Sequence, residues 1–158
     1  MSTAAVVVLA DEAATQHLGV RIATALDQKG WRIGLSGPLG AGKSTLARAI
    51  LRGLGVSGAV PSPTYTLIEP YTTSLGEAYH VDLYRISRAS ELLALGLPEL
   101  VADAALMLVE WPERDIAGVL DFDFILELDH VALARELQVR PRSKAGRRLC
   151  RAINWVGA

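Results

Sequence analysis

The most constraining feature of the chain is the glycine-rich segment at residues 37–44, which reads GPLGAGKS. It fits the pattern G-x-x-x-x-G-K-[ST], in which glycines let successive backbone N–H groups point at phosphate oxygens that a Cβ would obstruct. The run WRIGLSG at 31–37 predicts a strand before the loop, and KSTLARAILRGLG at 43–55 predicts a helix after it. This strand–loop–helix unit predicts a binding site for a nucleoside triphosphate.

Two residues of the loop have separate predicted roles. We expect Lys43 to reach the β- and γ-phosphates as a point charge, and Ser44 to offer its hydroxyl to Mg²⁺, a cation that prefers oxygen ligands. The positive end of the following helix adds to the attraction for phosphate. The predicted nucleotide contacts of the loop are Gly37, Leu39, Gly40, Ala41, Gly42, Lys43, Ser44 and Thr45.

Length and composition limit the class of protein. With 158 residues, of which 51% are hydrophobic and 21% charged, we expect one globular domain over residues 1–158. The lone Cys150 excludes a disulfide framework and favours a reducing cytoplasm. The longest apolar run, residues 4–10, is too short to span a bilayer and has no basic segment before it, so we expect neither a membrane span nor a secretory signal.

Charge is distributed unevenly along the chain. The net charge is −1, with 9 basic and 16 acidic side chains in residues 1–134 but 7 basic and 1 acidic in residues 135–158. The basic C-terminal region indicates an anionic partner, although such a run is also typical of a solvated surface. Trp155 is its only aromatic residue, so a base-stacking surface is not expected there.

Hydrophobic periodicity predicts strands and helices in alternation. Strands are expected at residues 6–9, 31–37, 66–73, 77–84, 105–111 and 121–129, with a hairpin turn at 74–76. Helices are expected from Ala14 to Ala25 and at 43–55, and one or two short helices, broken at Pro98, are expected at 88–103. Asp11 or Thr15 is expected to cap the first helix, and Lys29 and Gly30 to stop it.

A last hairpin is expected between residues 134–143 and 147–155, turning at 144–146. Strands that alternate with helices and are followed by late strands predict an α/β fold. We expect a P-loop NTPase-like three-layer α/β sandwich with a mixed, mostly parallel central sheet.

Two carboxylates end predicted strands. Asp82 ends AYHVD, and Glu110 ends the apolar strand ALMLVE. Ligands of α/β proteins bind at the carboxyl ends of strands, so either acid could hold Mg²⁺, and Glu110 could also orient the attacking water. A helix cap or a pair with an arginine is the ordinary alternative for each. Strand alternation places His80 on the face of Asp82, where a structural histidine is the more ordinary interpretation.

The segment PSPTYTLIE at residues 61–69 lies between the glycine loop and Asp82. Its two prolines and three hydroxyl residues predict a rigid polar loop near the phosphates. It occupies the position of a switch segment, in which a threonine senses the γ-phosphate. An ordinary proline turn before a strand is the alternative.

Four segments, in this order and spacing, together resemble the TsaE family of P-loop ATPases. They are GPLGAGKSTLAR at 37–48, SPTYTLIE at 62–69, HVDLYRI at 80–86 and LVEWPER at 108–114. The resemblance covers residues 5–130 and thins beyond them. The glycine loop alone is unspecific, whereas the later three segments together are specific.

The resemblance implies a function that the spacing of residues does not show. TsaE-like proteins take part in making N6-threonylcarbamoyladenosine (t6A) in tRNA. They bind the TsaD–TsaB complex, which transfers the threonylcarbamoyl group, and hydrolyse ATP to reset it. The resemblance therefore implies ATP and Mg²⁺ as cofactors, TsaD–TsaB as partner, and tRNA reached through that complex or touched by the basic C-terminal region.

The resemblance also assigns roles to residues of this chain. Lys43 and Ser44 carry over as phosphate and Mg²⁺ contacts. Thr64 and Thr66 belong to the switch-like segment, and Trp111 lies beside the nucleotide. The implied catalytic set is Lys43, Asp82 and Glu110, and the implied Mg²⁺ ligands are Ser44, Asp82 and Glu110.

One position departs from the family pattern. An acidic residue commonly follows the first glycine of the loop, but this chain has Pro38, which lacks an N–H donor. We expect phosphate binding to be kept with proline at this position. The role of the family's acidic residue is assigned to no residue of this chain. The pair Ser44-Thr45 replaces a frequent Thr-Thr, which is conservative because either hydroxyl can bind Mg²⁺.

Other classes of P-loop protein fit less well. A small-molecule kinase needs an arginine-rich lid, and residues 85–125 hold only Arg85, Arg88 and Arg114. A GTPase needs an N-K-x-D motif, and the only asparagine is Asn154. A kinase and a nucleotide-dependent binding module without significant turnover stay as alternatives. We expect an ATPase that is slow alone and stimulated by its partner.

Overall fold

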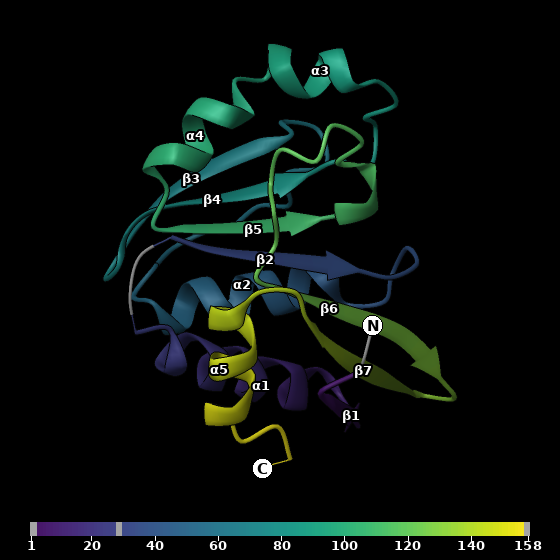
Figure 1. Cartoon of the computed structure of the whole chain (residues 1–158). Helices are drawn as coiled ribbons and strands as arrows, with labels where there is room; N and C mark the ends of the chain where they lie inside the picture. Colours follow the sequence, from purple (N-terminus) through teal and green to yellow (C-terminus); the bar gives the residue numbers. More distant parts are fainter. Residues whose placement is uncertain (1–2, 28–29, 157–158) are drawn as a thin grey trace.

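A computed structural model of the chain describes residues 3–27 and 30–156. Strands and helices alternate along the chain (Figure 1). The strands are β1 (Ala5–Leu9), β2 (Trp31–Ser36), β3 (Ile68–Thr73), β4 (Gly76–Asp82), β5 (Leu106–Glu110), β6 (Phe124–Val131) and β7 (Ala134–Pro141). The helices are α1 (Glu12–Ala25), α2 (Lys43–Gly53), α3 (Ala89–Ala94), α4 (Leu97–Asp103), α5 (Lys144–Ala152) and the short 3-10 helix η1 (Pro112–Arg114).

The strands of the described residues form one mixed seven-stranded sheet, in the order β1-β7-β6-β2-β5-β4-β3. The central strands β6, β2, β5 and β4 are parallel to one another, whereas β7 and β3 are antiparallel to their neighbours. Because β1 is antiparallel to β7, it points the same way as the central strands. The mixed, mostly parallel α/β sheet expected from the sequence is confirmed, and β2, β4 and β5 end at one edge (right in Figure 1).

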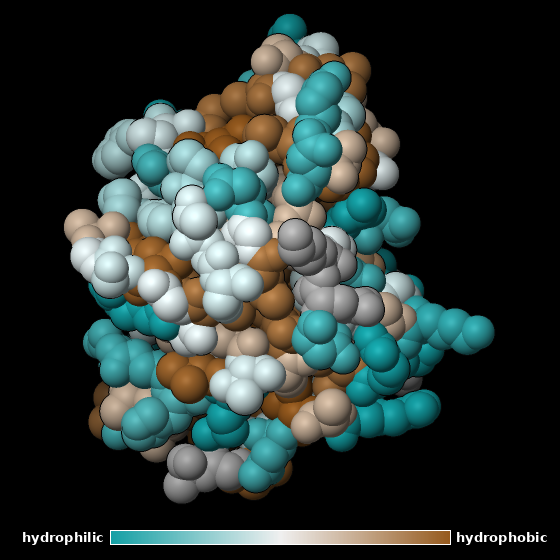
Figure 2. All heavy atoms as spheres, turned by 90° about the vertical axis from the view of Figure 1, so that its left-hand side faces the viewer, coloured by the Kyte–Doolittle hydropathy of each residue, from teal (hydrophilic) through white to brown (hydrophobic). Residues whose placement is uncertain are grey.

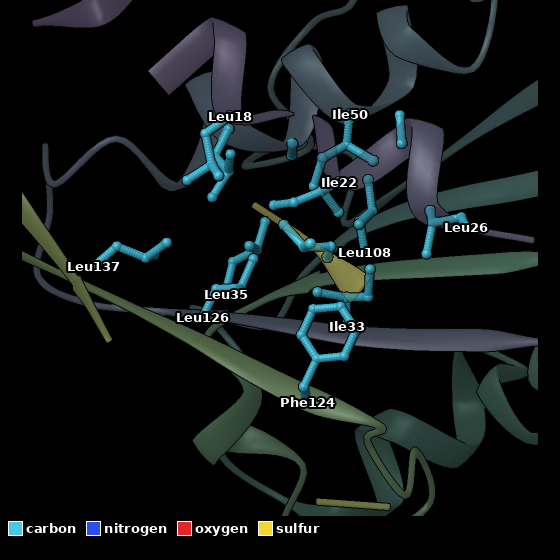
Figure 3. Packing of buried hydrophobic residues seen from close by; sticks show 14 of the residues in the cluster. Leu18, Ile22, Leu26, Ile33, Leu35, Ile50, Leu108, Phe124, Leu126 and Leu137 are labelled. Carbon is cyan, nitrogen blue, oxygen red and sulfur yellow. The ribbon is translucent and has the colours of Figure 1, made fainter. Parts of the chain in front are cut away.

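Helices cover both faces of the sheet. The larger core lies between α1, α2 and the sheet, where side chains from these helices and from β2 and β6 meet (Figure 3). Labelled members of this core are Leu18, Ile22, Ile50, Ile33, Leu35 and Phe124. A second core under α3 and α4 includes Val81, Met107 and Val109. Burial of each such side chain stabilises the fold by about 1.5–3 kcal/mol.

Strand β5 has every residue buried, as expected of a central strand with helices on both faces. Figure 2 shows the side of the molecule where the parallel strands begin. Hydrophobic and hydrophilic side chains are mixed on this surface. In the described residues no helix is long and apolar enough to cross a membrane.

The start of α1 follows one of the two expected caps. Asp11 caps the helix, because its Oδ1 accepts the N–H of Ala14 at 2.8 Å. Thr15 instead lies inside the helix and is buried. Of the two expected stop residues, Lys29 lies outside the described residues, and Gly30 has a φ of 93°, which suits glycine.

The predicted break at Pro98 is misplaced by two residues. The chain leaves α3 at Gly96, which has a φ of 73°. Pro98 lies in the first turn of α4, where a missing N–H breaks no helical hydrogen bond. Residues 88–103 therefore form two short helices, as one of the two expected arrangements had it.

The predicted C-terminal hairpin is wrong. β7 does form within residues 134–143, but it pairs with β6, and the chain turns between Val131 and Ala134. Residues 147–155 were expected as the second strand. Of these, residues 147–152 lie in α5, and residues 153–155 follow it. Ser143 caps this helix by accepting the N–H of Gly146 at 2.9 Å.

The spacing of apolar residues explains why this segment is helical. Leu149, Cys150 and Ile153 follow a helical repeat and are buried in the larger core, together with Trp155. The intervening basic residues face outward. A strand would have placed Leu149 and Cys150 on opposite faces.

Burial raises the pKa of the Cys150 thiol to about 11. Because the thiolate is the nucleophile, we expect iodoacetamide at pH 8 to alkylate Cys150 about 100-fold more slowly in the folded protein than in urea. Intact-mass spectrometry over time measures both rates. Equal rates in the two states would contradict the buried placement of Cys150.

Candidate functional site

The glycine loop joins β2 to α2 at the edge where the parallel strands end. Gly37 has a φ of 139°, and a Cβ there would lie 2.1 Å from the Leu128 carbonyl oxygen of β6. Gly40 and Gly42 also have positive φ values, of 76° and 104°. The loop therefore needs glycine for backbone conformation at three positions, and at Gly37 also for a close approach to the neighbouring strand.

Lys43 is the first residue of α2, directly after the loop, and is only 5% exposed. Its Nζ donates to the carbonyl oxygens of Gly37 and Pro38, at 2.6 Å and 2.8 Å, and lies 4.4 Å from the centroid of the Trp111 ring. Burial lowers the pKa of the Lys43 ammonium group, while the carboxylates of Glu110 and Asp82 pull it upward. Pro38 lacks an N–H but supplies one of the two acceptors that hold this cation.

Asp82 and Glu110 lie side by side as register partners at the ends of β4 and β5. Both are buried. Ser44 Oγ donates to the Glu110 carboxylate, with its two oxygens at 2.9 Å and 3.0 Å, and Thr64 Oγ1 donates to Asp82 Oδ2 at 3.1 Å. The structure thus brings together the three residues that the sequence indicated for Mg²⁺.

This trio fits a hard divalent cation in its chemistry, because a hydroxyl and two carboxylates are the oxygen donors that Mg²⁺ prefers. No cluster of three or more His, Cys, Asp or Glu that could hold a metal by itself occurs in residues 3–27 and 30–156. Ser44, Asp82 and Glu110 are therefore candidates that would act together with phosphate oxygens, as in sites where protein carboxylates share Mg²⁺ with a nucleotide.

His80, the buried neighbour of the acids, contacts Glu110. Its Nε2 lies 2.7 Å from Glu110 Oε2. The sequence favoured an ordinary structural histidine here, and the structure places its imidazole against one of the two candidate acids.

The switch-like segment reaches the site through one of its two threonines. Thr64 contacts Asp82, and the preceding hydroxyl of Ser62 lies 2.8 Å from Thr64 Oγ1. Thr66 is exposed and does not line the cavity. The exposed ring of Tyr65 lies 4.9 Å from the guanidinium of Arg85, which helps to hold the segment against the end of β4.

A cavity of about 270 Å³ lies over the loop and the acid pair. Residues expected at the site that line it are Leu39, Gly40, Gly42, Lys43, Ser44, Thr45, Thr64, Asp82, Glu110 and Trp111. Gly37 and Ala41 support the loop without lining this cavity. Tyr84 also lines this cavity, and the centroid of its ring lies 5.0 Å from that of the Trp111 ring. The sequence did not predict Tyr84 as a site residue. Its place two residues after Asp82 was the signal that could have indicated it.

A second cavity, of about 180 Å³, adjoins the other side of the loop and shares Gly40, Gly42 and Thr45 with the first. Its remaining walls come from the junction of β1 with α1 and from the turn between β6 and β7: Leu9, Ala10, Asp11, Glu12, Thr15, Leu133 and Arg135. Arg135 Nη2 donates to the Gly40 carbonyl oxygen at 3.4 Å. The sequence offered no signal for this side, because its residues are far apart along the chain.

A larger cavity of about 750 Å³ lies on the far side of η1, between Glu113 and Arg147. Its walls include no glycine of the loop and neither Asp82 nor Glu110. We therefore place the functional site in the two smaller cavities beside the loop, the first of which is lined by Lys43, Ser44, Asp82 and Glu110.

The fold and the site define a mixed α/β protein built around a strand–glycine loop–helix unit. A comparison with known families then identifies it: the model of "Threonylcarbamoyl adenosine biosynthesis protein TsaE" matches residues 9–142. The chain belongs to the TsaE family. The resemblance seen in its sequence segments is thereby confirmed.

Individual relatives agree with this assignment. The tRNA threonylcarbamoyladenosine biosynthesis protein TsaE of Haemophilus influenzae is 34% identical over 127 residues, covering 80% of each chain. The protein of the same name from Aquifex aeolicus is 39% identical over 128 residues, covering 78% of this chain and 85% of that one. The crystal structure of Bacillus subtilis YdiB superposes with a TM-score of 0.75 at 25% identity, covering 94% of this chain and 92% of that one.

The close approach of Gly37 to β6 predicts unequal effects of alanine at two loop glycines. At Gly40 the new Cβ meets no atom within 4 Å, so only backbone strain of about 1–2 kcal/mol is expected. At Gly37 the Cβ also meets the Leu128 carbonyl oxygen, and we expect Gly37→Ala to lower the free energy of unfolding by more than about 3 kcal/mol. Urea unfolding measures both, and equal losses would contradict the contact.

Proposed function

We propose that the protein binds ATP with Mg²⁺ and hydrolyses it in support of the TsaD–TsaB complex, which transfers the threonylcarbamoyl group to adenosine in tRNA. One observation carries the proposal: Lys43, Ser44, Asp82 and Glu110 converge on one cavity. This set supplies a cation for phosphates, oxygen ligands for a divalent metal, and a carboxylate to orient water. The names of the relatives support the tRNA reaction. A cytoplasmic location is part of the same proposal.

The loop and Lys43 would hold the phosphates. The Lys43 ammonium group is already held at the loop by two neutral carbonyl oxygens. Phosphate oxygens are stronger acceptors for an ammonium group than neutral carbonyls are, so they can recruit the same group without moving it far. The N-terminus of α2, which begins at Lys43, adds backbone N–H groups and a partial positive charge.

The acid pair would serve the reacting end of the nucleotide. Mg²⁺, when bound, would neutralise charge on the phosphates, with Ser44, Asp82 and Glu110 as its protein ligands. Glu110 is also placed to orient a water molecule, because it lies at the cavity wall at the end of β5. Thr64, which donates to Asp82, links the switch-like segment to the same group.

The second cavity fits the nucleoside. It adjoins the loop at Gly40, Gly42 and Thr45, so a nucleotide with its phosphates on the loop would extend into it. Leu9 and Leu133 offer apolar contact to a base, and Asp11 and Arg135 offer polar groups.

The small-molecule kinase alternative loses support because two of its three candidate lid arginines have other contacts. Arg85 lies over the Tyr65 ring, and Arg114 donates to the Ile86 carbonyl oxygen at 3.3 Å. A binding module without turnover has the same phosphate contacts but would not need a carboxylate to orient water. The position of Glu110 favours hydrolysis over simple binding.

Exposed apolar side chains around the mouth of the site support a protein partner there. Leu39, Tyr65 and Leu133 are 67%, 82% and 96% exposed. They come from the glycine loop, the switch-like segment and the β6–β7 turn, which frame the two cavities. We propose that TsaD–TsaB contacts this rim, so that partner binding and the nucleotide act on the same segments.

The basic C-terminal region takes the form of a cationic helix. The exposed residues of α5 that share one face are Lys144, Arg147, Arg148 and Arg151. Among the described residues, one ion pair involves this face, between Arg148 and Asp27 at 3.8 Å. Hydrophilic side chains project at the lower right of Figure 2, on the side where Figure 1 places α5. We propose that this face contacts an anionic surface of the complex, either the partner protein or its tRNA.

Two substitutions separate binding from turnover. We expect Glu110→Gln to keep ATP affinity within about threefold but to lower hydrolysis about 100-fold, because the loop and Lys43 hold the phosphates without it. Lys43→Ala should weaken binding at least about 10-fold and lower hydrolysis as well. Isothermal titration and phosphate release measure the two quantities. Glu113→Gln, next to the site but outside its lining, is the matched control, and normal hydrolysis by Glu110→Gln would contradict the proposed role.

Partner stimulation is the second expected outcome. ATP hydrolysis should be slow alone and at least about 10-fold faster with TsaD–TsaB, because no arginine of the described residues lines the cavity over the acid pair. Replacing the four basic residues of the α5 face by alanine should reduce stimulation most at low salt, where charge contacts are strongest. Equal, fast rates with and without the complex would contradict the proposed function.

A further inference from the structure

His80 is a completely buried polar side chain whose two ring nitrogens have different surroundings. Nε2 lies 2.7 Å from Glu110 Oε2. Nδ1 is buried, and no hydrogen-bond partner for it occurs among the described residues. On β4 the side chain lies on the face of Asp82, with Leu108 of β5 as its register partner. The imidazole therefore lies one row deeper in the sheet than the two acids.

These surroundings select one tautomer of the imidazole. A carboxylate oxygen can only accept, so the nitrogen that faces Glu110 must carry the hydrogen. A hydrogen on Nδ1 would be a buried donor without an acceptor, at a cost of about 1–3 kcal/mol. The geometry therefore favours hydrogen on Nε2 and a lone pair on Nδ1.

The Glu110 carboxylate is held by donors from two elements. Ser44, at the start of α2, reaches both of its oxygens, and His80, inside β4, reaches Oε2. Ser44 is also a candidate metal ligand, so its hydroxyl has a second task during turnover. His80 belongs to the sheet, does not line the cavity, and has no such second task.

We propose that His80 is a positioning residue for Glu110: its Nε2–H fixes the carboxylate in the orientation that hydrolysis needs, without touching the nucleotide. This inference rests on the proposed ATPase function. It goes beyond that function by assigning the orientation of Glu110 to a residue inside the sheet.

Packing alone does not account for a histidine at this position. The preceding residue on the same face, Ala78, and the register partner Leu108 are both buried and apolar. An apolar side chain would fill such a place without leaving a buried Nδ1 unpaired. The imidazole adds one feature that an apolar residue lacks, which is the hydrogen bond to Glu110.

The first test observes the hydrogen bond without any nucleotide. We expect ¹⁵N-edited NMR of the imidazole groups to show a protonated Nε2 and an unprotonated Nδ1 for His80, with resonances assigned by their loss in His80→Gln. The exposed His17 and His130 serve as internal references for a mixture of tautomers. A hydrogen on Nδ1, or a tautomer mixture like that of the references, would overturn the proposal.

The second test compares two substitutions that differ in the hydrogen bond. We expect His80→Leu to lower kcat at least about 10-fold while KM for ATP changes by less than about threefold, because Glu110 is misplaced and the phosphate contacts are kept. His80→Gln, whose amide N–H can reach the same oxygen, should recover most of kcat. Tyr71→Phe, which removes another buried polar group without a partner in the described residues, is the control and should leave kcat unchanged.

The outcomes separate the two proposals. If the parent protein does not hydrolyse ATP with TsaD–TsaB present, the proposed function fails, and the NMR result still decides the His80–Glu110 hydrogen bond. If the parent protein hydrolyses ATP, an unchanged kcat in His80→Leu, equal losses in both variants, or a change in KM alone overturns the positioning role. If His80→Leu does not fold, His80→Gln and the NMR measurement still decide.

Discussion

The parallel register of β2, β5 and β4 is the constraint on which the candidate site depends. It places Asp82 directly beside Glu110, and it places Glu110 beside Leu35, close to where β2 passes into the glycine loop. Side chains alternate between the faces of a strand, so a shift of one residue in β5 would turn Glu110 toward α3 and α4. The apolar residues that hold this register are thus also what keeps the acids on the side of Ser44.

A second constraint is the burial of charged and polar groups at that edge. Lys43, His80, Asp82 and Glu110 are all buried, and each would be costly there alone. Hydrogen bonds offset this cost. Lys43 donates to loop carbonyl oxygens, and Asp82 accepts a hydrogen bond from Thr64. Glu110 forms hydrogen bonds with Ser44 and His80. Loss of one member leaves another without a partner, which makes the group act as a unit.

Local signals in the sequence were enough to predict the loop and its neighbours. Lys43 and Ser44 follow from a contiguous pattern, and Asp82 and Glu110 from their places at strand ends. The structure brings all four together, along with Thr64 but not Thr66. The C-terminal hairpin was wrong because the helical spacing of Leu149, Cys150 and Ile153 and the cap at Ser143 outweigh the strand-like appearance of the segment.

Other parts of the site were beyond local pattern. Tyr84 is the last residue of the predicted strand 77–84, and only the packing of its ring against Trp111 places it in the cavity. Leu133 and Arg135 are far from the loop in sequence. They reach it because β6, which pairs with β7, also pairs with β2, the strand that leads into the loop. His80 was recognised as a strand residue, but its contact with Glu110 depends on how β4 and β5 are aligned.

The first strand, β1, pairs with the last strand, β7, and this has a consequence for synthesis of the protein. A nascent chain that has emerged as far as residue 120 contains the whole glycine loop and both acids. It still lacks β6, whose Leu128 carbonyl backs Gly37, and β7, which anchors β1 and carries Arg135. The candidate site is therefore completed only in the last part of translation, and a chain that stops early keeps the residues of the site without the walls that hold them.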